Sequence, residues 1–143
     1  MAYANRRTVL VVDDHAAIRS LCRIGLEEAG MRVIEAADGV EALEQIRRER
    51  PALILLDIML PRKSGWEVAA ELLNERSTDD VPIVFISALT GKRERARAQQ
   101  LGAFDYLSKP LDPAVLARSV TDILDRVESG NRASLLAETF GGA

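Results

Sequence analysis

Five polar residues in this sequence each come at or shortly after the end of a short apolar run, and together they could bind a metal ion. Singly, each has an ordinary structural explanation, such as a helix cap, a turn hydroxyl or a surface lysine. As a set they combine three carboxylates, one hydroxyl and one ammonium, which is harder to explain by structural roles alone. The five residues are Asp13, Asp14, Asp57, Ser87 and Lys109.

Three neighbouring carboxylates would repel one another strongly. Two unit charges 4 Å apart cost roughly 4 kcal/mol at an effective dielectric constant near 20. Either the carboxyl groups take up protons, which raises their pKa values, or a hard divalent cation binds between them. Oxygen ligands with room for water suit Mg2+. The single charge of Lys109 compensates too little.

The apolar runs that precede these residues are typical of buried strands, because they are short and rich in β-branched residues or leucine. Stretches with helical spacing separate them. The predicted strands are 8–12, 32–35, 53–56, 83–86 and, more weakly, 104–107. The predicted helices are 18–29 before Gly30, 38–50 before Pro51, 65–76, 91–101 and 112–127.

Local signals support these boundaries. Asp38 followed by Glu41 predicts a helix start, and Cys22 falls on the inner stripe of the first helix, where it is interpreted as a core residue. Strict alternation of strand and helix indicates an α/β fold with a doubly wound parallel sheet covered on both faces. In such sheets ligands bind beyond the carboxyl ends of the strands, where all five polar residues are expected to converge.

Composition narrows the function classes. The chain has 143 residues and a net charge of -3, which fits one folded core and lacks the basic excess of a nucleic-acid binder. A single cysteine excludes an internal disulfide and favours a reducing, cytoplasmic setting. No apolar run reaches the roughly 18 residues of a membrane span. We therefore expect no direct nucleic-acid or membrane partner.

With these residues in view, the sequence resembles the receiver domain of bacterial two-component response regulators, over about residues 8–127. The resemblance implies a flavodoxin-like (βα)5 fold with strand order 2-1-3-4-5. It leaves 1–7 as an N-terminal extension and 128–143 as a tail or the start of a linker helix. The motifs that carry it are Val11-Val12-Asp13-Asp14, Asp57-Ile58-Met59-Leu60-Pro61 with Gly65, Ser87-Ala88, and the run from Gly102 to Pro110.

The resemblance implies that Asp57 accepts a phosphoryl group from a phosphohistidine, on a sensor histidine kinase or a histidine phosphotransfer protein. It implies that Asp14, Asp57 and the backbone carbonyl of Met59 bind Mg2+, with Asp13 acting through a water molecule. The other phosphoryl contacts would come from Ser87, Lys109 and the backbone N–H of Ala88.

The same resemblance implies a switch. Ser87 would move toward the phosphoryl group, and Tyr106 would turn inward, so that binding changes at the face formed by 91–101, 104–107 and 112–127. The Lys109–Pro110 bond would be cis and aim the lysine into the site. Phe104 stands where receivers that dimerise through this face commonly carry an acidic residue, which leaves a monomer or a phosphorylation-dependent dimer open.

Three other functions are alternatives to a receiver domain. A haloacid-dehalogenase-like phosphatase needs a second aspartate two residues after the nucleophile, where this chain has Met59. A flavodoxin-like cofactor binder needs a phosphate loop rich in Ser, Thr and Gly after the first strand, which is missing. A binding module that signals without phosphorylation is the serious rival. A downstream target protein, or an output domain if the chain is a fragment, also stays open.

Overall fold

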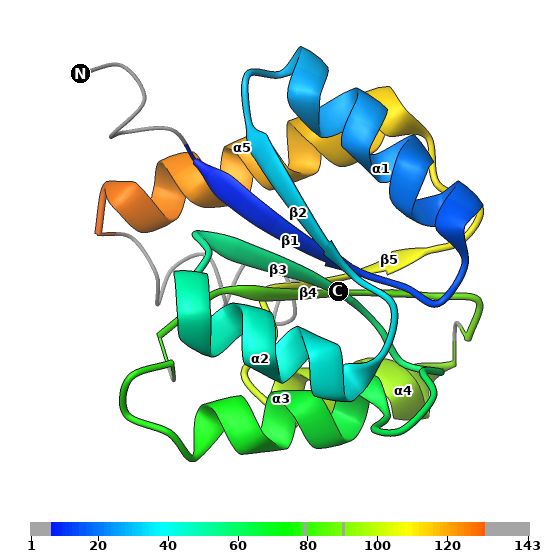
Figure 1. The fold of residues 1–143 in the computed structure, drawn as a ribbon, viewed down its shortest axis with the longest axis vertical. Coiled ribbons are helices and arrows are strands. Elements are labelled where there is room, and N and C mark those ends of the chain that lie inside the picture. The colour runs from blue at the N-terminus through cyan, green and yellow to red at the C-terminus, as the bar shows by residue number, and fades with distance from the viewer. Residues whose placement is uncertain (1–6, 79, 90, 131–143) are drawn as a thin grey trace.

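A single sheet of five parallel strands forms the centre of the molecule, with helices on both of its faces (Figure 1). The computed structural model describes residues 7–78, 80–89 and 91–130. The strands lie in the order β2-β1-β3-β4-β5, which confirms the predicted doubly wound topology. Their bounds are β1 Thr8–Val12, β2 Arg32–Ala36, β3 Leu53–Asp57, β4 Ile83–Ser87 and β5 Asp105–Ser108.

The strand register places the polar residues at one edge of the sheet. Asp57, the last residue of β3, pairs with Ile86 of β4, and Ser87 pairs with Ser108 at the end of β5. Val12 ends β1, so Asp13 lies just beyond the ladder. Because the strands are parallel, their carboxyl ends face the same way, and the polar side chains that could bind a ligand lie together at that edge.

Two layers of helices bury the sheet. In Figure 1, α1 and α5 cover one face, while α2, α3 and α4 cover the other. Side chains alternate between the faces, so neighbours such as Val9 and Leu10 of β1 belong to different apolar clusters. Cys22 lies fully buried in the α1–α5 layer, as expected, and burial raises the pKa of its thiol to about 12. The helices are α1 Ala16–Glu28, α2 Gly39–Glu49, α3 Gly65–Leu73, α4 Lys92–Gln100 and α5 Pro113–Glu128.

Side-chain caps explain why three of the helices start where they do. The Asp38 carboxylate accepts a 2.8 Å bond from the Glu41 N–H at the start of α2. Ser64 and Glu67 form a reciprocal capping box at α3, and Asp112 accepts from two N–H groups of α5. Each cap satisfies N–H groups that have no partner within the helix.

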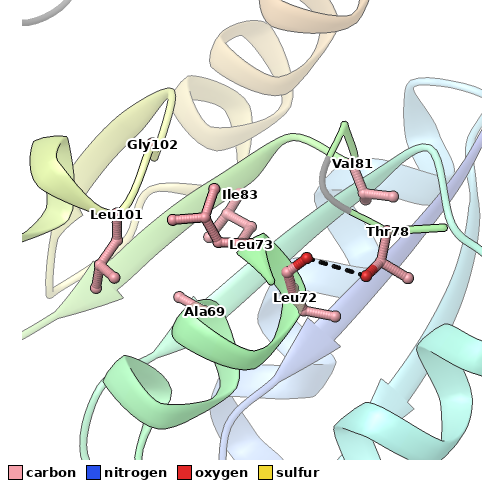
Figure 2. A pocket seen from close by; sticks show the side chains of 8 residues that line it. All are labelled: Ala69, Leu72, Leu73, Thr78, Val81, Ile83, Leu101 and Gly102. Atoms are coloured by element: carbon pink, nitrogen blue, oxygen red, sulfur yellow. Dashed lines mark hydrogen bonds between the residues drawn. The ribbon is translucent and has the colours of Figure 1, made fainter. Parts of the chain in front are cut away.

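The third helix ends at Leu73, three residues earlier than the predicted Arg76. A turn replaces its last residues: Thr78 N–H donates to the Glu75 carbonyl, and the Thr78 hydroxyl donates to the Leu72 carbonyl at 3.1 Å (Figure 2). This side-chain bond adds to the 3.2 Å bond that the Leu72 carbonyl accepts from the Glu75 N–H. Strand β5 likewise begins at Asp105, one residue after the expected start.

A cavity of about 30 Å³ lies beside this turn, between Ala69, Leu73 and Ile83 (Figure 2). Its lining is mostly apolar, and its volume is about that of one water molecule. Ile83 is the first residue of β4, so the cavity lies at the opposite end of that strand from Ser87. It is too small to hold an organic ligand.

Two predicted segments fall mainly outside the described residues. The N-terminal extension is described only at residue 7, and the tail only at 128–130. Among the helices of the described residues, none is long and apolar enough to cross a membrane.

Candidate functional site

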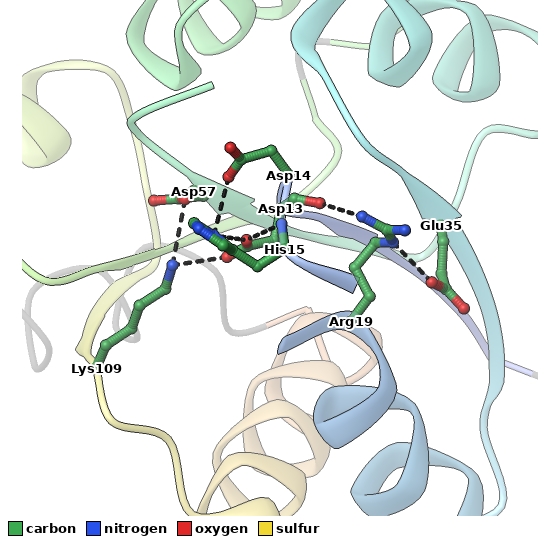
Figure 3. Close-up of polar contacts among 7 residues, drawn as sticks. All are labelled: Asp13, Asp14, His15, Arg19, Glu35, Asp57 and Lys109. Atoms are coloured by element: carbon green, nitrogen blue, oxygen red, sulfur yellow. Dashed lines mark hydrogen bonds and ion pairs between the residues drawn. The ribbon is translucent and has the colours of Figure 1, made fainter. Parts of the chain in front are cut away.

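Two buried aspartates and one lysine meet at the carboxyl edge of the sheet. The Lys109 ammonium lies 2.7 Å from Asp13 Oδ2 and 3.2 Å from Asp57 Oδ2 (Figure 3). Asp13 is fully buried and Asp57 is 4% exposed. The lysine therefore forms a bridge between the ends of β1 and β3, which are neighbours in the sheet.

The backbone near Lys109 is held by its neighbours. Its N–H donates to the Ser87 carbonyl at 2.9 Å, which joins the end of β5 to the end of β4. The peptide bond between Lys109 and Pro110 is cis, the geometry that the resemblance implies.

Burial and charge act against each other in this group. Burial raises the pKa of Asp57, the nearby charge of Asp13 raises it further, and Lys109 opposes both. Burial by itself lowers the pKa of Lys109, but its bonds to Asp13 and Asp57 outweigh burial and raise it. Lys109 is therefore charged at neutral pH, while ionised Asp57 carries an energetic cost that a further cation would relieve.

Asp14 and His15 lie at the solvent-exposed side of the same edge. The His15 imidazole Nδ1 is 3.1 Å from Asp14 Oδ1 and 3.2 Å from Asp13 Oδ1. The His15 N–H donates to Asp13 Oδ1 at 2.9 Å. The sequence reasoning missed His15, although its place directly after two aspartates, both candidate metal ligands, was a usable signal.

The donor set fits a hard divalent cation. Ligand atoms of Asp13, Asp14 and His15 lie within 4.8 Å of one another, and Asp57 lies across Lys109 from Asp13. The carboxylates supply oxygen ligands, and the exposure of Asp14 leaves room for the water molecules that Mg2+ retains. The pKa of Asp57 is raised because burial and Asp13 destabilise its ionised form, which a bound cation would stabilise.

Ser87 and Tyr106 are linked through the backbone of Leu89. The Leu89 N–H donates to the Ser87 hydroxyl at 3.1 Å, and the Tyr106 hydroxyl donates to the Leu89 carbonyl. Tyr106 is 3% exposed and its ring lies 6.4 Å from that of Phe85. The tyrosine thus points inward in this structure, and burial raises its pKa.

The remaining predicted site residues lie nearby on loops. Met59, two residues after Asp57, is 67% exposed, and Ala88 is exposed directly after Ser87. Gly65 is required by close packing, because a Cβ there would lie 2.2 Å from the Asp57 carbonyl oxygen. Trp66, next to it, packs against Phe85 with 4.8 Å between the ring centroids.

Comparison with known proteins agrees with this geometry. A family model for the response regulator receiver domain matches residues 9–121. The response regulator MprA of Mycobacterium leprae is 40% identical over 133 residues, which cover 92% of this chain and 57% of that protein. The phosphate regulon regulator PhoB of Pseudomonas aeruginosa is 37% identical over 125 residues, covering 87% and 55%. The chain spans about half the length of the curated relatives it matches.

Solved structures show the same fold. A CheY-like receiver domain protein from Methanospirillum hungatei has a TM-score of 0.82 and 28% identity, covering 88% of this chain and 99% of that one. A response regulator structure from Chloroflexus aurantiacus has a TM-score of 0.80 and 32% identity, covering 85% and 100%. The buried Asp13–Lys109–Asp57 group, the strand order and these matches lead to one conclusion: the chain belongs to the response regulator receiver domain family of two-component systems.

Proposed function

We propose that Asp57 is the phosphoryl acceptor of this receiver domain and that the chain works as a phosphorylation switch. The observation that carries the proposal is the buried pair of Asp13 and Asp57 bridged by Lys109. A carboxylate with one charged partner on a single side, at the open edge of a parallel sheet, is positioned for attack on an electrophile. Phosphoryl transfer needs positioning and charge neutralisation more than covalent help.

The transfer step balances without a further reactant. An oxygen of Asp57 forms a bond to the phosphorus of a phosphohistidine, presented by a histidine kinase or a histidine phosphotransfer protein. The bond from phosphorus to nitrogen breaks, and its electron pair stays on the imidazole, whose other nitrogen carries the proton. Neutral imidazole leaves, and Asp57 carries an acyl phosphate. Self-catalysed transfer from a small phosphodonor, and self-catalysed hydrolysis, belong to the same proposal.

Mg2+ fits the donors on this edge. Asp14, Asp57 and the Met59 carbonyl would hold it, with Asp13 acting through water. When bound, Mg2+ would neutralise charge on the phosphoryl oxygens and the carboxylates. Lys109 would turn one of its N–H bonds from Asp57 to a phosphoryl oxygen, and its bond to Asp13 would keep its ammonium in place.

The switch would begin at Ser87. Its hydroxyl now accepts from Leu89 N–H, and donation to a phosphoryl oxygen, together with the Ala88 N–H, would pull this segment toward Asp57. Leu89 also holds the Tyr106 hydroxyl, so displacement of this segment disturbs a buried aromatic residue of β5. Binding would then change at the α4, β5 and α5 face.

An exposed apolar surface fits a phosphodonor protein. Ile24 of α1 is 57% exposed and Val115 of α5 is 47% exposed, on two helices that pack together. A groove of about 240 Å³ beside Val115 is lined by Pro110 and Leu111, directly after Lys109. A partner that docks there would lie beside the segment that carries Lys109, whose ammonium bonds to Asp57. We propose this surface for the kinase or phosphotransfer protein.

The remaining proposals concern the whole protein. We propose 8–127 as the receiver unit, with 1–7 as an extension and 128–143 as a tail or linker, acting in the cytoplasm as a monomer or a phosphorylation-dependent dimer. The relatives that it matches are about twice as long, which leaves room for an output domain in the same protein. The downstream partner would be such an output domain or a separate target protein.

Mass spectrometry of the intact protein tests the acceptor. After incubation with acetyl phosphate and Mg2+, the wild type should gain one phosphoryl group, and Asp57→Asn should gain none. Asp105→Asn is a matched control, because burial raises the pKa of Asp105 as it does that of Asp57. It should still gain the group. A folded wild type that binds Mg2+ but never gains mass would favour a phosphorylation-independent binding module.

A further inference from the structure

Arg19 of α1 reaches from its helix to the backbone of Asp13. Its Nη1 donates to the Asp13 carbonyl oxygen at 2.7 Å, and its Nε donates to Glu35 Oε1 of β2 at 2.9 Å (Figure 3). The Arg19 side chain is only 19% exposed. One guanidinium therefore joins α1, the end of β1 and the end of β2.

Asp13 is held at each of its polar atoms. Its N–H donates to the Ala36 carbonyl, its Oδ1 accepts from His15 N–H, and its Oδ2 accepts from Lys109. Its carbonyl lies beyond Val12, the last residue of β1, and accepts from Arg19. Arg19 therefore completes the set of bonds that determines where the buried Asp13 carboxylate points.

Glu35 orients Arg19 by holding the other edge of its guanidinium. Burial raises the pKa of Glu35, but bonds from Arg23 and Arg19 outweigh burial and keep it low, so the carboxylate is ionised at neutral pH. Arg23 makes its own 2.8 Å bond to Glu35 and a 3.0 Å bond to Glu27. The bonds of Arg23 go to these glutamates, whereas Arg19 adds the bond to Asp13. The two arginines are thus a natural pair for comparison.

We propose that Arg19 is a positioning residue for the metal and phosphoryl site, acting through the Asp13 backbone. The inference rests on the proposed Mg2+-dependent function and extends it to a residue outside the edge of the sheet. Loss of the guanidinium leaves the Asp13 carbonyl without its charged donor, so the position of Asp13 then depends only on its bonds to Ala36, His15 and Lys109. Groups that orient ligands in this way typically contribute about 10-fold or more to metal affinity.

Calorimetric titration with MgCl2 tests the proposal. Arg19→Met keeps the apolar stem and removes all donors, and Arg23→Met does the same to its neighbour on Glu35. We expect Arg19→Met to weaken Mg2+ binding about 10-fold, and Arg23→Met to change it less than about twofold. Arg19→Lys restores one donor to the Asp13 carbonyl and should recover much of the affinity. Urea unfolding of each variant separately reports the structural role of the two arginines.

The outcomes separate the two proposals. A wild type that neither binds Mg2+ nor gains a phosphoryl group overturns both. A wild type that does both, with Mg2+ affinities of Arg19→Met and Arg23→Met that match each other, overturns the role of Arg19 alone. If Arg19→Met does not fold, the same titration of Arg19→Gln decides, because the shorter amide cannot span Asp13 and Glu35 together; an unchanged affinity there also overturns it.

Discussion

The Lys109 ammonium lies 2.7 Å from the Asp13 carboxylate, although 96 positions separate the two residues in the chain. The same nitrogen lies 3.2 Å from Asp57. One cation thus compensates two buried carboxylates, and the order of strands β1, β3, β4 and β5 brings them together. This arrangement couples the stability of the domain to the state of its candidate acceptor.

Removal of Lys109 should destabilise the domain strongly. In Lys109→Met, the two buried carboxyl groups lose the ammonium that compensates them, and breaking such a group typically costs about 3 kcal/mol or more. Urea unfolding in EDTA measures this loss. Lys63→Met, which removes only a pair with the exposed Glu71, should change the unfolding free energy by less than about 1 kcal/mol. Equal stability of the two variants would contradict the bridge.

Asp57→Asn should stabilise the metal-free domain, increasingly so as the pH rises. In the folded state, the pKa of Asp57 is raised above its ordinary value. The contribution of Asp57 to the free energy of unfolding is therefore fully present at pH values below the pKa of the unfolded chain. It is lost as the pH rises through the pKa of the folded chain. Asparagine does not ionise, so its contribution to the free energy of unfolding does not fall with rising pH.

Unfolding curves of both chains at several pH values in EDTA check this prediction. The unfolding free energy of the variant should gain on that of the wild type as the pH rises above about 4, the ordinary pKa of an aspartate. The raised pKa of Asp105 affects both chains alike and cancels in the difference. A difference that does not change with pH would show that Asp57 ionises without cost.

Mg2+ should stabilise the wild type by binding only the folded state. At ten times the dissociation constant, the gain in unfolding free energy is about 1.4 kcal/mol. Asp14→Asn should lose most of this gain, because it removes one of the proposed metal ligands. Glu27→Gln, on the far end of α1, should keep it. Retention of the full gain by Asp14→Asn would remove Asp14 from the ligand set.

Substitution of Tyr106 should leave phosphorylation intact but remove the conformational change that follows it. The rings of Trp66, Phe85 and Tyr106 form a chain of contacts, with centroids 4.8 Å and 6.4 Å apart. Phosphorylation that moves Leu89 should therefore change Trp66 fluorescence in the wild type. Tyr106→Ala should still gain a phosphoryl group by mass but lose the fluorescence change.

A variant that keeps the Tyr106 ring provides the control. Tyr106→Phe loses only the hydroxyl bond to the Leu89 carbonyl, worth about 1 kcal/mol, and keeps the packing. It should retain part of the Trp66 signal. A full signal from Tyr106→Ala would show that the relay does not pass through this residue.

Gly65→Ala should damage both stability and phosphorylation. Its Cβ would lie 2.2 Å from the Asp57 carbonyl oxygen and 2.8 Å from Ile58 Cα, and backbone atoms cannot yield cheaply. We expect a loss of about 3 kcal/mol and slower gain of the phosphoryl group. At Gly91, the cap residue of α4, a Cβ meets only the flexible Glu94 carboxylate, so Gly91→Ala should cost less than about 1 kcal/mol.

Local patterns in the sequence predicted the strands, the helices and their parallel arrangement, whereas the strand order was implied by the resemblance to receiver domains. Short apolar runs that alternate with helical stripes predicted five strands and five helices, and all ten are present. Asp57, Ser87 and Lys109 were expected at the strand ends because parallel strands deliver their carboxyl ends to one edge. These inferences succeed because strand burial and helix periodicity are properties of neighbouring residues.

The contacts within the site depended on tertiary structure. The bond from Arg19 to Asp13, the bridge of Lys109 to two aspartates and the place of His15 beside both Asp13 and Asp14 each depend on register and side-chain rotamer. Helix α3 ends at Leu73 in a turn where the Thr78 hydroxyl bonds to the Leu72 carbonyl, a contact that no apolar pattern encodes. Such bonds join residues whose distance in space is decided only when the sheet and its helices pack together.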